Sequence, residues 1–220
     1  MKGTTETPEV SLVLSCYDRP DLLPMSLGAI YAQSMTDFVC LVTDNATDDT
    51  VARQHERIVK WYAGLDKRSK RAPRFLYVRT HGRLKQCDCY WSAEYGVERL
   101  RKIGRLGRWL GFPCDDTQYF PLHLQRVLAF AAKNLVDCVN VGLPVVSPVG
   151  ATRNSAGYQV WELTDMSAKT TFLVRSKHFR GFVCKLSSPG AYSADINFTM
   201  DLRRRGVSYG VMNETTLCHN

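Results

Sequence analysis

The stretch VSLVLSCYDRPDLLPMSLGAIYAQSMTDFVCLVTDNATDDT, from Val10 to Thr50, decides the fold class. Its first residues form a short run of aliphatic and β-branched side chains, which is typical of a buried strand. Apolar residues at helical spacing follow, with Pro20 near the expected start of the helix. A second apolar run, Phe38 to Val42, predicts another strand. The order strand, helix, strand indicates an α/β fold with a parallel sheet.

The same alternation continues along the rest of the chain. Apolar residues at Val51, Ile58 and Val59 predict a helix, for which Thr47 or Asp48 is a candidate N-cap. The further predicted elements are a strand in 74–80, a helix in 90–104, a strand in 108–113, a helix in 121–134, strands in 136–150, 158–165 and 170–176, a helix in 193–206 and strand-like segments in 207–220. We therefore expect a mostly parallel sheet that is flanked by helices, in one domain spanning 1–220.

Composition and charge limit the functional classes. The 220 residues are 45% hydrophobic and 23% charged, which is ordinary for a folded soluble domain. No run approaches the roughly 20 apolar residues that cross a bilayer, and the polar N-terminus has no signal core. We expect a cytoplasmic protein, with peripheral binding at the inner membrane surface as an alternative. The net charge of +8 favours anionic partners such as nucleotide phosphates or nucleic acid.

Polar residues follow three of the predicted strands directly. Tyr17 and Asp18 come after the first strand, and Asp44 and Asn45 come after the second. The adjacent acids of the stretch 114–117 come after a later strand, 108–113. The carboxyl ends of parallel strands meet at one edge of a sheet, where ligands usually bind. We therefore expect these side chains to lie on one rim.

The adjacent carboxylates of Asp115 and Asp116 repel each other, so a cation should lie nearby. The chain offers Arg79, Arg83 and Lys85 just past the third strand as basic candidates. Carboxylates with basic side chains at strand ends suit a nucleotide and its divalent metal, because Mg²⁺ or Mn²⁺ takes oxygen ligands.

Each of these residues also has a simpler structural interpretation. Asp44 and Asn45 are good turn formers, and one of Asp115 and Asp116 could cap the following helix. Asp195, at the start of a predicted helix, could act only through the helix dipole. From the residues alone these alternatives stay open.

Taken together, the motifs resemble the family 2 glycosyltransferases, which have the GT-A nucleotide-sugar-binding fold. The opening stretch is similar to that family's first strand, first helix and second strand. GRWLGFPCDDTQYFPLHLQ (107–125) resembles its strand with the aspartate motif, and FRGF (179–182) resembles its glycine-phenylalanine turn. YSADINFTMDLRRRGVSYGVMNETTLCHN (192–220) resembles the helix of the catalytic aspartate and a strand ending in histidine. The resemblance covers nearly the whole chain.

The resemblance implies a metal-dependent inverting glycosyltransferase that uses a nucleotide-diphosphate sugar, with a UDP-sugar as the expected donor and Mn²⁺ or Mg²⁺ as cofactor. It implies a nucleotide-sugar half at about 9–120 and an acceptor half at about 121–220. By their positions, the expected site residues are Tyr17, Asp18, Asp44, Asn45, Arg83, Lys85 and Asp115 for the donor, Asp116 and His219 for the metal, and Asp195 as the catalytic base.

Three positions depart from the family pattern. Cys114 stands where an acid usually precedes the aspartate pair, Ala194 replaces an acid beside Asp195, and Thr43 replaces one beside Asp44. These losses support an alternative, a non-catalytic GT-A-like module that binds nucleotide or nucleic acid. For an enzyme, the expected acceptor is a glycan, a lipid-linked sugar or a hydroxylated base in DNA. The basic run 98–108 favours the last of these.

Overall fold

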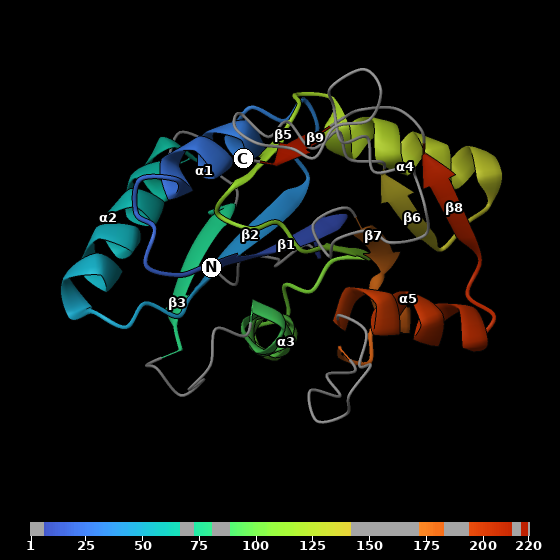
Figure 1. Ribbon diagram of the computed structural model, residues 1–220. Coiled ribbons are helices and arrows are strands. Elements are labelled where there is room, and N and C mark those ends of the chain that lie inside the picture. The colour runs from blue at the N-terminus through green and yellow to red at the C-terminus, as the bar shows by residue number, and fades with distance from the viewer. Residues whose placement is uncertain are drawn as a thin grey trace, which may run out of the picture.

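The computed structural model describes residues 7–66, 73–80, 89–141, 172–182, 194–212 and 217–219, and describes 89, 194–196 and 217–219 by their backbone alone. Within these ranges the chain forms a seven-stranded sheet with helices on both faces, together with a separate two-stranded sheet (Figure 1). The fold is therefore α/β with a mostly parallel sheet, as the sequence predicts.

The elements follow the predicted order closely. They are β1 (Val10–Cys16), α1 (Leu23–Tyr31), β2 (Phe38–Asp44), α2 (Asp49–Leu65), β3 (Phe75–Arg79), α3 (Cys89–Lys102), β4 (Trp109–Gly111), β5 (Thr117–Tyr119), α4 (His123–Asn134), β6 (Cys138–Val141), β7 (Phe172–Arg175), the 3₁₀ turn η3 (Ser176–His178), α5 (Ala194–Arg204), β8 (Tyr209–Met212) and β9 (Leu217–His219). The short strand β5 was not predicted, and the strand predicted in 158–165 lies outside the described residues.

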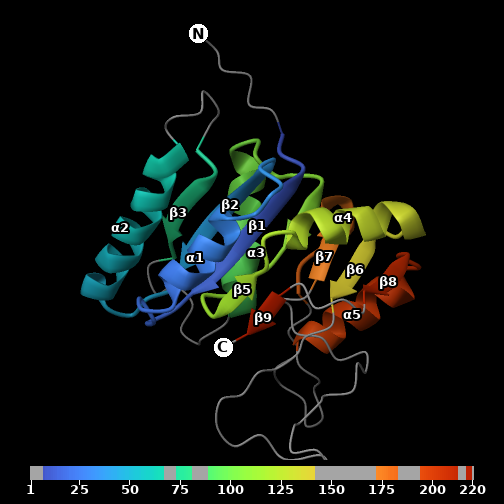
Figure 2. The same cartoon turned by 90° about the horizontal axis from the view of Figure 1, so that it is seen from above.

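The strand order in the large sheet is β3-β2-β1-β4-β7-β6-β8. Figure 2 shows the sheet from above, with β3, β2 and β1 toward one side and β7, β6 and β8 toward the other. β1 pairs in parallel with both β2 and β4, and β7 runs antiparallel to β4 and β6. Strands β5 and β9 form the small antiparallel sheet, in which Thr117 lies opposite His219. The last described strand of the chain thus returns to the segment that follows Asp116.

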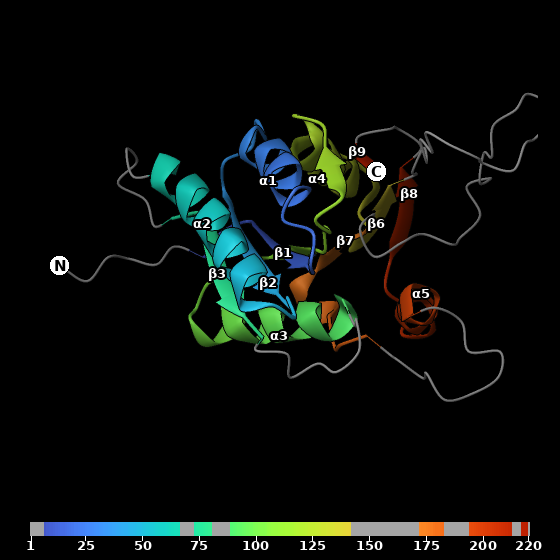
Figure 3. The same cartoon turned by 60° about the vertical axis from the view of Figure 1, so that its left-hand side comes forward.

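Helices cover both faces of the large sheet. Helices α1, α2 and α4 pack on one face, and α3 and α5 pack on the other (Figure 3). Because both faces are covered, every residue of β1 and of β2 is buried, which explains why apolar residues predominate in both strands without a polar alternation. Among the described helices, none combines the length and the apolar character that a membrane crossing requires.

Helix termini settle two of the open alternatives. Asp48 caps α2, since its carboxylate accepts hydrogen bonds from the backbone N–H groups of Thr50 and Val51. Helix α4 has Leu122 at its N-cap, without a side-chain hydrogen bond. The interpretation of Asp115 or Asp116 as the cap of this helix is therefore wrong. These acids lie before β5, and both of their carboxylates pair with Arg19.

Helix α3 packs directly on β1 and β2 through a glycine. A Cβ added at Gly96 would lie 2.4 Å from Cγ1 of Val13 and 2.8 Å from Cγ2 of Thr43. Such distances are too short for any real contact, so a side chain here would push α3 off the strands that carry the rim.

We predict that Gly96→Ala lowers the free energy of unfolding by about 1–3 kcal/mol, because overpacking at this contact outweighs alanine's better helix propensity. Urea denaturation measures the change. Gly64→Ala is the matched control: Gly64 lies in α2, and its added Cβ would meet nothing within 4 Å. The control should be neutral or more stable, and an equal loss in both variants would contradict the close packing of α3.

Candidate functional site

The candidate site lies at the carboxyl ends of β1, β2 and β4. The backbone N–H of Ser15, near the end of β1, donates to the carbonyl of Pro113, and Ser15 pairs with Cys114 just past β4. This pairing brings Tyr17 beside Asp115, whose Oδ2 accepts a hydrogen bond from the Tyr17 backbone N–H at 3.4 Å. Two segments nearly a hundred residues apart therefore form one rim, as the sequence predicts for parallel strands.

The aspartate pair is bridged by Arg19, a residue of the loop between β1 and α1. Its Nη1 donates to Oδ2 of Asp116 at 2.9 Å, and its Nη2 donates to Oδ1 of Asp115. The Asp115 side chain is fully buried, whereas 47% of the Arg19 side chain is exposed. The cation that adjacent acids require is thus Arg19. Arg19 is not among the basic residues past the third strand that the sequence suggested for this role.

The protein environment makes a nearby positive charge necessary. Burial raises the pKa of the Asp115 carboxyl above its usual value, the charge of Arg19 lowers it, and the neighbouring Asp116 raises it again. The backbone of the same residue is also held, since Oγ of Ser26 in α1 donates to the carbonyl of Asp115 at 2.6 Å. The carboxylates are therefore fixed in place, and they stabilise a cation at the rim.

Asp18 connects the loops that follow β1 and β2. Its Oδ1 accepts a hydrogen bond from the Thr47 backbone N–H at 2.9 Å, and its Oδ2 accepts one from the Thr47 hydroxyl at 2.6 Å. Asn45 directly follows β2 and is held there by two hydrogen bonds. Its backbone N–H donates to the carbonyl of Cys16, and its Oδ1 accepts from the Thr80 hydroxyl at 2.8 Å. Both predicted donor-site residues belong to the rim.

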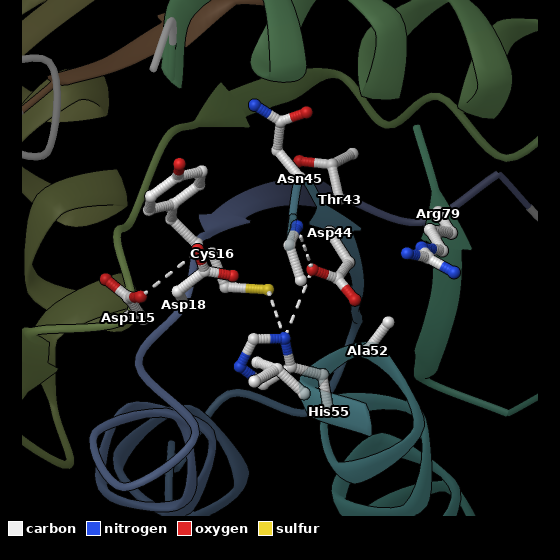
Figure 4. A network of polar contacts seen from close by, with 12 residues as sticks. Cys16, Asp18, Thr43, Asp44, Asn45, Ala52, His55, Arg79 and Asp115 are labelled. Atoms are coloured by element: carbon white, nitrogen blue, oxygen red, sulfur yellow. Dashed lines mark hydrogen bonds and ion pairs between the residues drawn. The ribbon is translucent and has the colours of Figure 1, made fainter. Parts of the chain in front are cut away.

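Asp44 lies one layer deeper, in a hydrogen-bonded network (Figure 4). Its side chain is fully buried, and its Oδ1 accepts from the Ala46 backbone N–H at 2.8 Å and from Nδ1 of His55 at 3.1 Å. Its Oδ2 accepts from the Tyr77 hydroxyl at 2.6 Å. Asp44 therefore ties the end of β2 to α2 and β3. A direct contact with a nucleotide base stays a prediction.

Cys16 completes this network. Its Sγ lies 3.7 Å from Nδ1 of His55, and the ligating atoms of Cys16, Asp44 and His55 all lie within 4.8 Å of one another. Three hydrogen bonds already occupy the Asp44 carboxylate, however, and burial raises the pKa of the Cys16 thiol well above its usual value. These contacts join Cys16, Asp44 and His55 in one buried network, and their ligating atoms are close enough together to hold a metal ion.

Other predicted site residues lie farther from these contacts. Arg79 pairs with Asp49 in the first turn of α2, with Nη1 and Oδ1 2.6 Å apart, and so does not serve the aspartate pair. Arg83 and Lys85 lie outside the described residues. Asp195 is the second residue of α5, and the backbone of His219 lies opposite Thr117, directly after Asp116 in sequence.

Comparisons with known proteins give a fold. No family model matches the chain, and no curated protein matches it. Solved structures do: S. aureus TarS 1-349 superposes with a TM-score of 0.67 at 15% identity, over 96% of this chain and 60% of that chain. The mannosyltransferase PcManGT from Pyrobaculum calidifontis superposes with a TM-score of 0.64 at 14% identity, over 98% of this chain and 57% of that chain.

The chain has the GT-A fold. It spans 57 to 60% of the length of these two solved chains. TarS 1-349 has been solved in complex with UDP and with UDP-GlcNAc, and PcManGT in complex with GDP-Man and Mn²⁺. The architecture expected from the motif resemblance is thus confirmed.

We predict that Asp44→Asn lowers the free energy of unfolding by about 2–4 kcal/mol near neutral pH, because His55 and Tyr77 lose a buried charged acceptor. Burial raises the pKa of Asp44, but the hydrogen bonds from His55, Tyr77 and Ala46 outweigh it and hold this pKa below 3.8. The stabilisation is therefore complete above about pH 3.8 and disappears as the pH falls through the folded-state pKa.

Denaturation of both proteins in urea over the acid range measures this dependence. Asp48→Asn is the control, since asparagine is as good an N-cap as aspartate and the Asp48 side chain lies outside the network. A difference between wild type and Asp44→Asn that stays constant down to pH 3 would show that the Asp44 charge is not what the network stabilises.

Proposed function

We propose that the protein is a metal-dependent inverting glycosyltransferase, which transfers a sugar from a nucleotide-diphosphate sugar to a hydroxyl acceptor. The observation that carries the proposal is the position of Asp115 and Asp116. They form a fixed acidic pair at the carboxyl end of β4, beside the loop that follows β1, in a chain with the GT-A fold. This edge is where a doubly wound sheet binds its ligand.

The donor would lie along the rim from β2 to β4. In this proposal Tyr17, Asp18 and Asn45 would contact the nucleoside, and Asp44 would support the end of β2 that carries Asn45. We propose a UDP-sugar as donor, supported by the complexes of TarS with UDP and UDP-GlcNAc. The diphosphate would lie toward Asp115 and Asp116, with Arg83 and Lys85 as further basic groups.

The acidic pair fits a divalent cation. Two carboxylates with little exposure, which already hold the guanidinium of Arg19, supply oxygen ligands of the kind that Mn²⁺ and Mg²⁺ prefer. We propose that Asp116 and His219 hold the metal, since β9 pairs with β5 right after Asp116. A bound metal would offset the negative charge of the departing diphosphate.

Asp195, in the first turn of α5, is the proposed general base. It would accept the proton of the acceptor hydroxyl as that oxygen attacks the anomeric carbon. The attack comes from the face opposite the leaving group, so the bond from carbon to the diphosphate oxygen breaks and the configuration inverts. The products are the glycoside and the nucleoside diphosphate, and the proton stays on Asp195 until solvent removes it.

The acceptor is proposed by class only. A glycan, a lipid-linked sugar and a hydroxylated base in DNA all present a hydroxyl group. The net charge of +8 and the basic residues of α3 (Arg99, Arg101, Lys102) favour an acceptor that carries negative charge. An enzyme that acts in the cytoplasm, either free or bound at the inner membrane surface, would meet each of these classes.

Calorimetric titration with UDP-GlcNAc, UDP-glucose and GDP-mannose, with and without Mn²⁺, tests the proposal. We expect one donor to bind in the presence of Mn²⁺, and Asp116→Asn to weaken that binding at least tenfold, which is about 1.4 kcal/mol. Asp137→Asn is the control, because Asp137 pairs with Lys177 and His178 just before β6, at the other edge of the sheet. It should bind the donor like wild type.

Turnover distinguishes the enzyme from a binding module. We expect Asp195→Asn to retain donor binding and to lose about 10²- to 10⁴-fold in release of nucleoside diphosphate, because only proton transfer is removed. If no donor binds while duplex DNA binds in a salt-sensitive way, the chain is a nucleic-acid-binding module and the proposed enzyme is wrong.

A further inference from the structure

Arg19 occupies one oxygen of each carboxylate in the pair that a divalent cation would use. Its guanidinium bonds Oδ1 of Asp115 with one nitrogen and Oδ2 of Asp116 with the other, so it neutralises both carboxylates at once. Such charge-assisted, two-pronged contacts are among the strongest hydrogen bonds in proteins. A guanidinium and a divalent cation on the same two carboxylates would also repel each other strongly. The two cations therefore compete for one position.

The surroundings allow the arginine to leave while the acids stay. About half of the Arg19 side chain is exposed, and the Asp115 side chain is fully buried. The Arg19 backbone is held in its turn, because its N–H donates to the Tyr17 carbonyl and its own carbonyl accepts from the Leu22 N–H at 3.2 Å. Only the side chain has to swing outward, and Asp115 remains fixed through Tyr17 and Ser26.

We propose that Arg19 is a built-in competitor of the divalent cation: its guanidinium neutralises Asp115 and Asp116 and must release both before the metal binds. The proposal rests on the proposed function in taking this pair as the metal site. It adds that the metal affinity of the chain is set by the exchange of these two cations. Arg19 is therefore a residue that controls loading of the site.

The test measures Mn²⁺ binding without nucleotide, by the electron paramagnetic resonance signal of the free ion. We expect Arg19→Gln to bind Mn²⁺ about 5- to 150-fold more tightly than wild type, the range of typical coupling between two bound groups. Arg19→Lys keeps the positive charge but loses the two-pronged contact, so its Mn²⁺ affinity should lie between those of wild type and Arg19→Gln. Arg175→Gln is the matched control, because Arg175 pairs with Asp137 far from the rim.

Thermal unfolding gives a second readout that does not depend on activity. Without metal, Arg19→Gln leaves a buried carboxylate unpaired, so its midpoint should lie below that of wild type. Saturating Mn²⁺ should raise the midpoint of Arg19→Gln by more than that of wild type, because the tighter site gains more from the same ion concentration. Arg19→Lys repeats the comparison in a variant that retains the charge and the fold.

The outcomes separate this proposal from the proposed function. Equal Mn²⁺ affinity in wild type and Arg19→Gln, with binding lost in Asp116→Asn, overturns the competition and leaves the metal site in place. Weaker binding in Arg19→Gln also overturns it, since Arg19 would then support the ion. If no variant binds Mn²⁺, or if Asp116→Asn binds it like wild type, then both the metal site and the competition are wrong.

Discussion

Two carboxylates side by side at the end of a buried strand require a cation, and the arrangement of the whole rim follows from that requirement. Asp115 is fully buried, and Arg19 reaches it from the loop after β1. The same carboxylate accepts the Tyr17 backbone N–H, and the Asp115 carbonyl accepts the Ser26 hydroxyl. One pair of charges thus joins β4, the β1–α1 loop and α1, so the geometry of the site is built into the core packing.

The rim has two layers with different tasks. The outer layer holds Asp18, Asn45 and the aspartate pair, which connect the loops that follow the strands. The inner layer holds Asp44 and His55, which are fully buried and bonded to each other. Because the inner layer connects β2 with α2 and β3, it keeps the loops of the outer layer in register. The GT-A fold supplies this arrangement, and the chemistry proposed for it depends on the outer layer.

The sequence was sufficient for the fold and for much of the rim. Apolar runs bounded by polar turns predicted the strands, and the ends of parallel strands placed Tyr17, Asp44 and Asp115 on one edge. Arg19 was missed because its partners lie 96 and 97 residues away, and no local pattern pairs an arginine with distant acids. The role of His55 was missed because it lies among the apolar positions of α2, and only the packed sheet reveals its partner. Strand β5 forms only through β9, a contact between distant segments.

A crystal structure of the chain with Mn²⁺ and the UDP-sugar that binds it would test the central claim most directly. The account predicts the metal on Asp116, the diphosphate beside it at the end of β4, and the Arg19 side chain turned away from both aspartates. A nucleotide bound elsewhere, or a metal bound away from an intact pair of Arg19 with Asp115 and Asp116, would contradict the account.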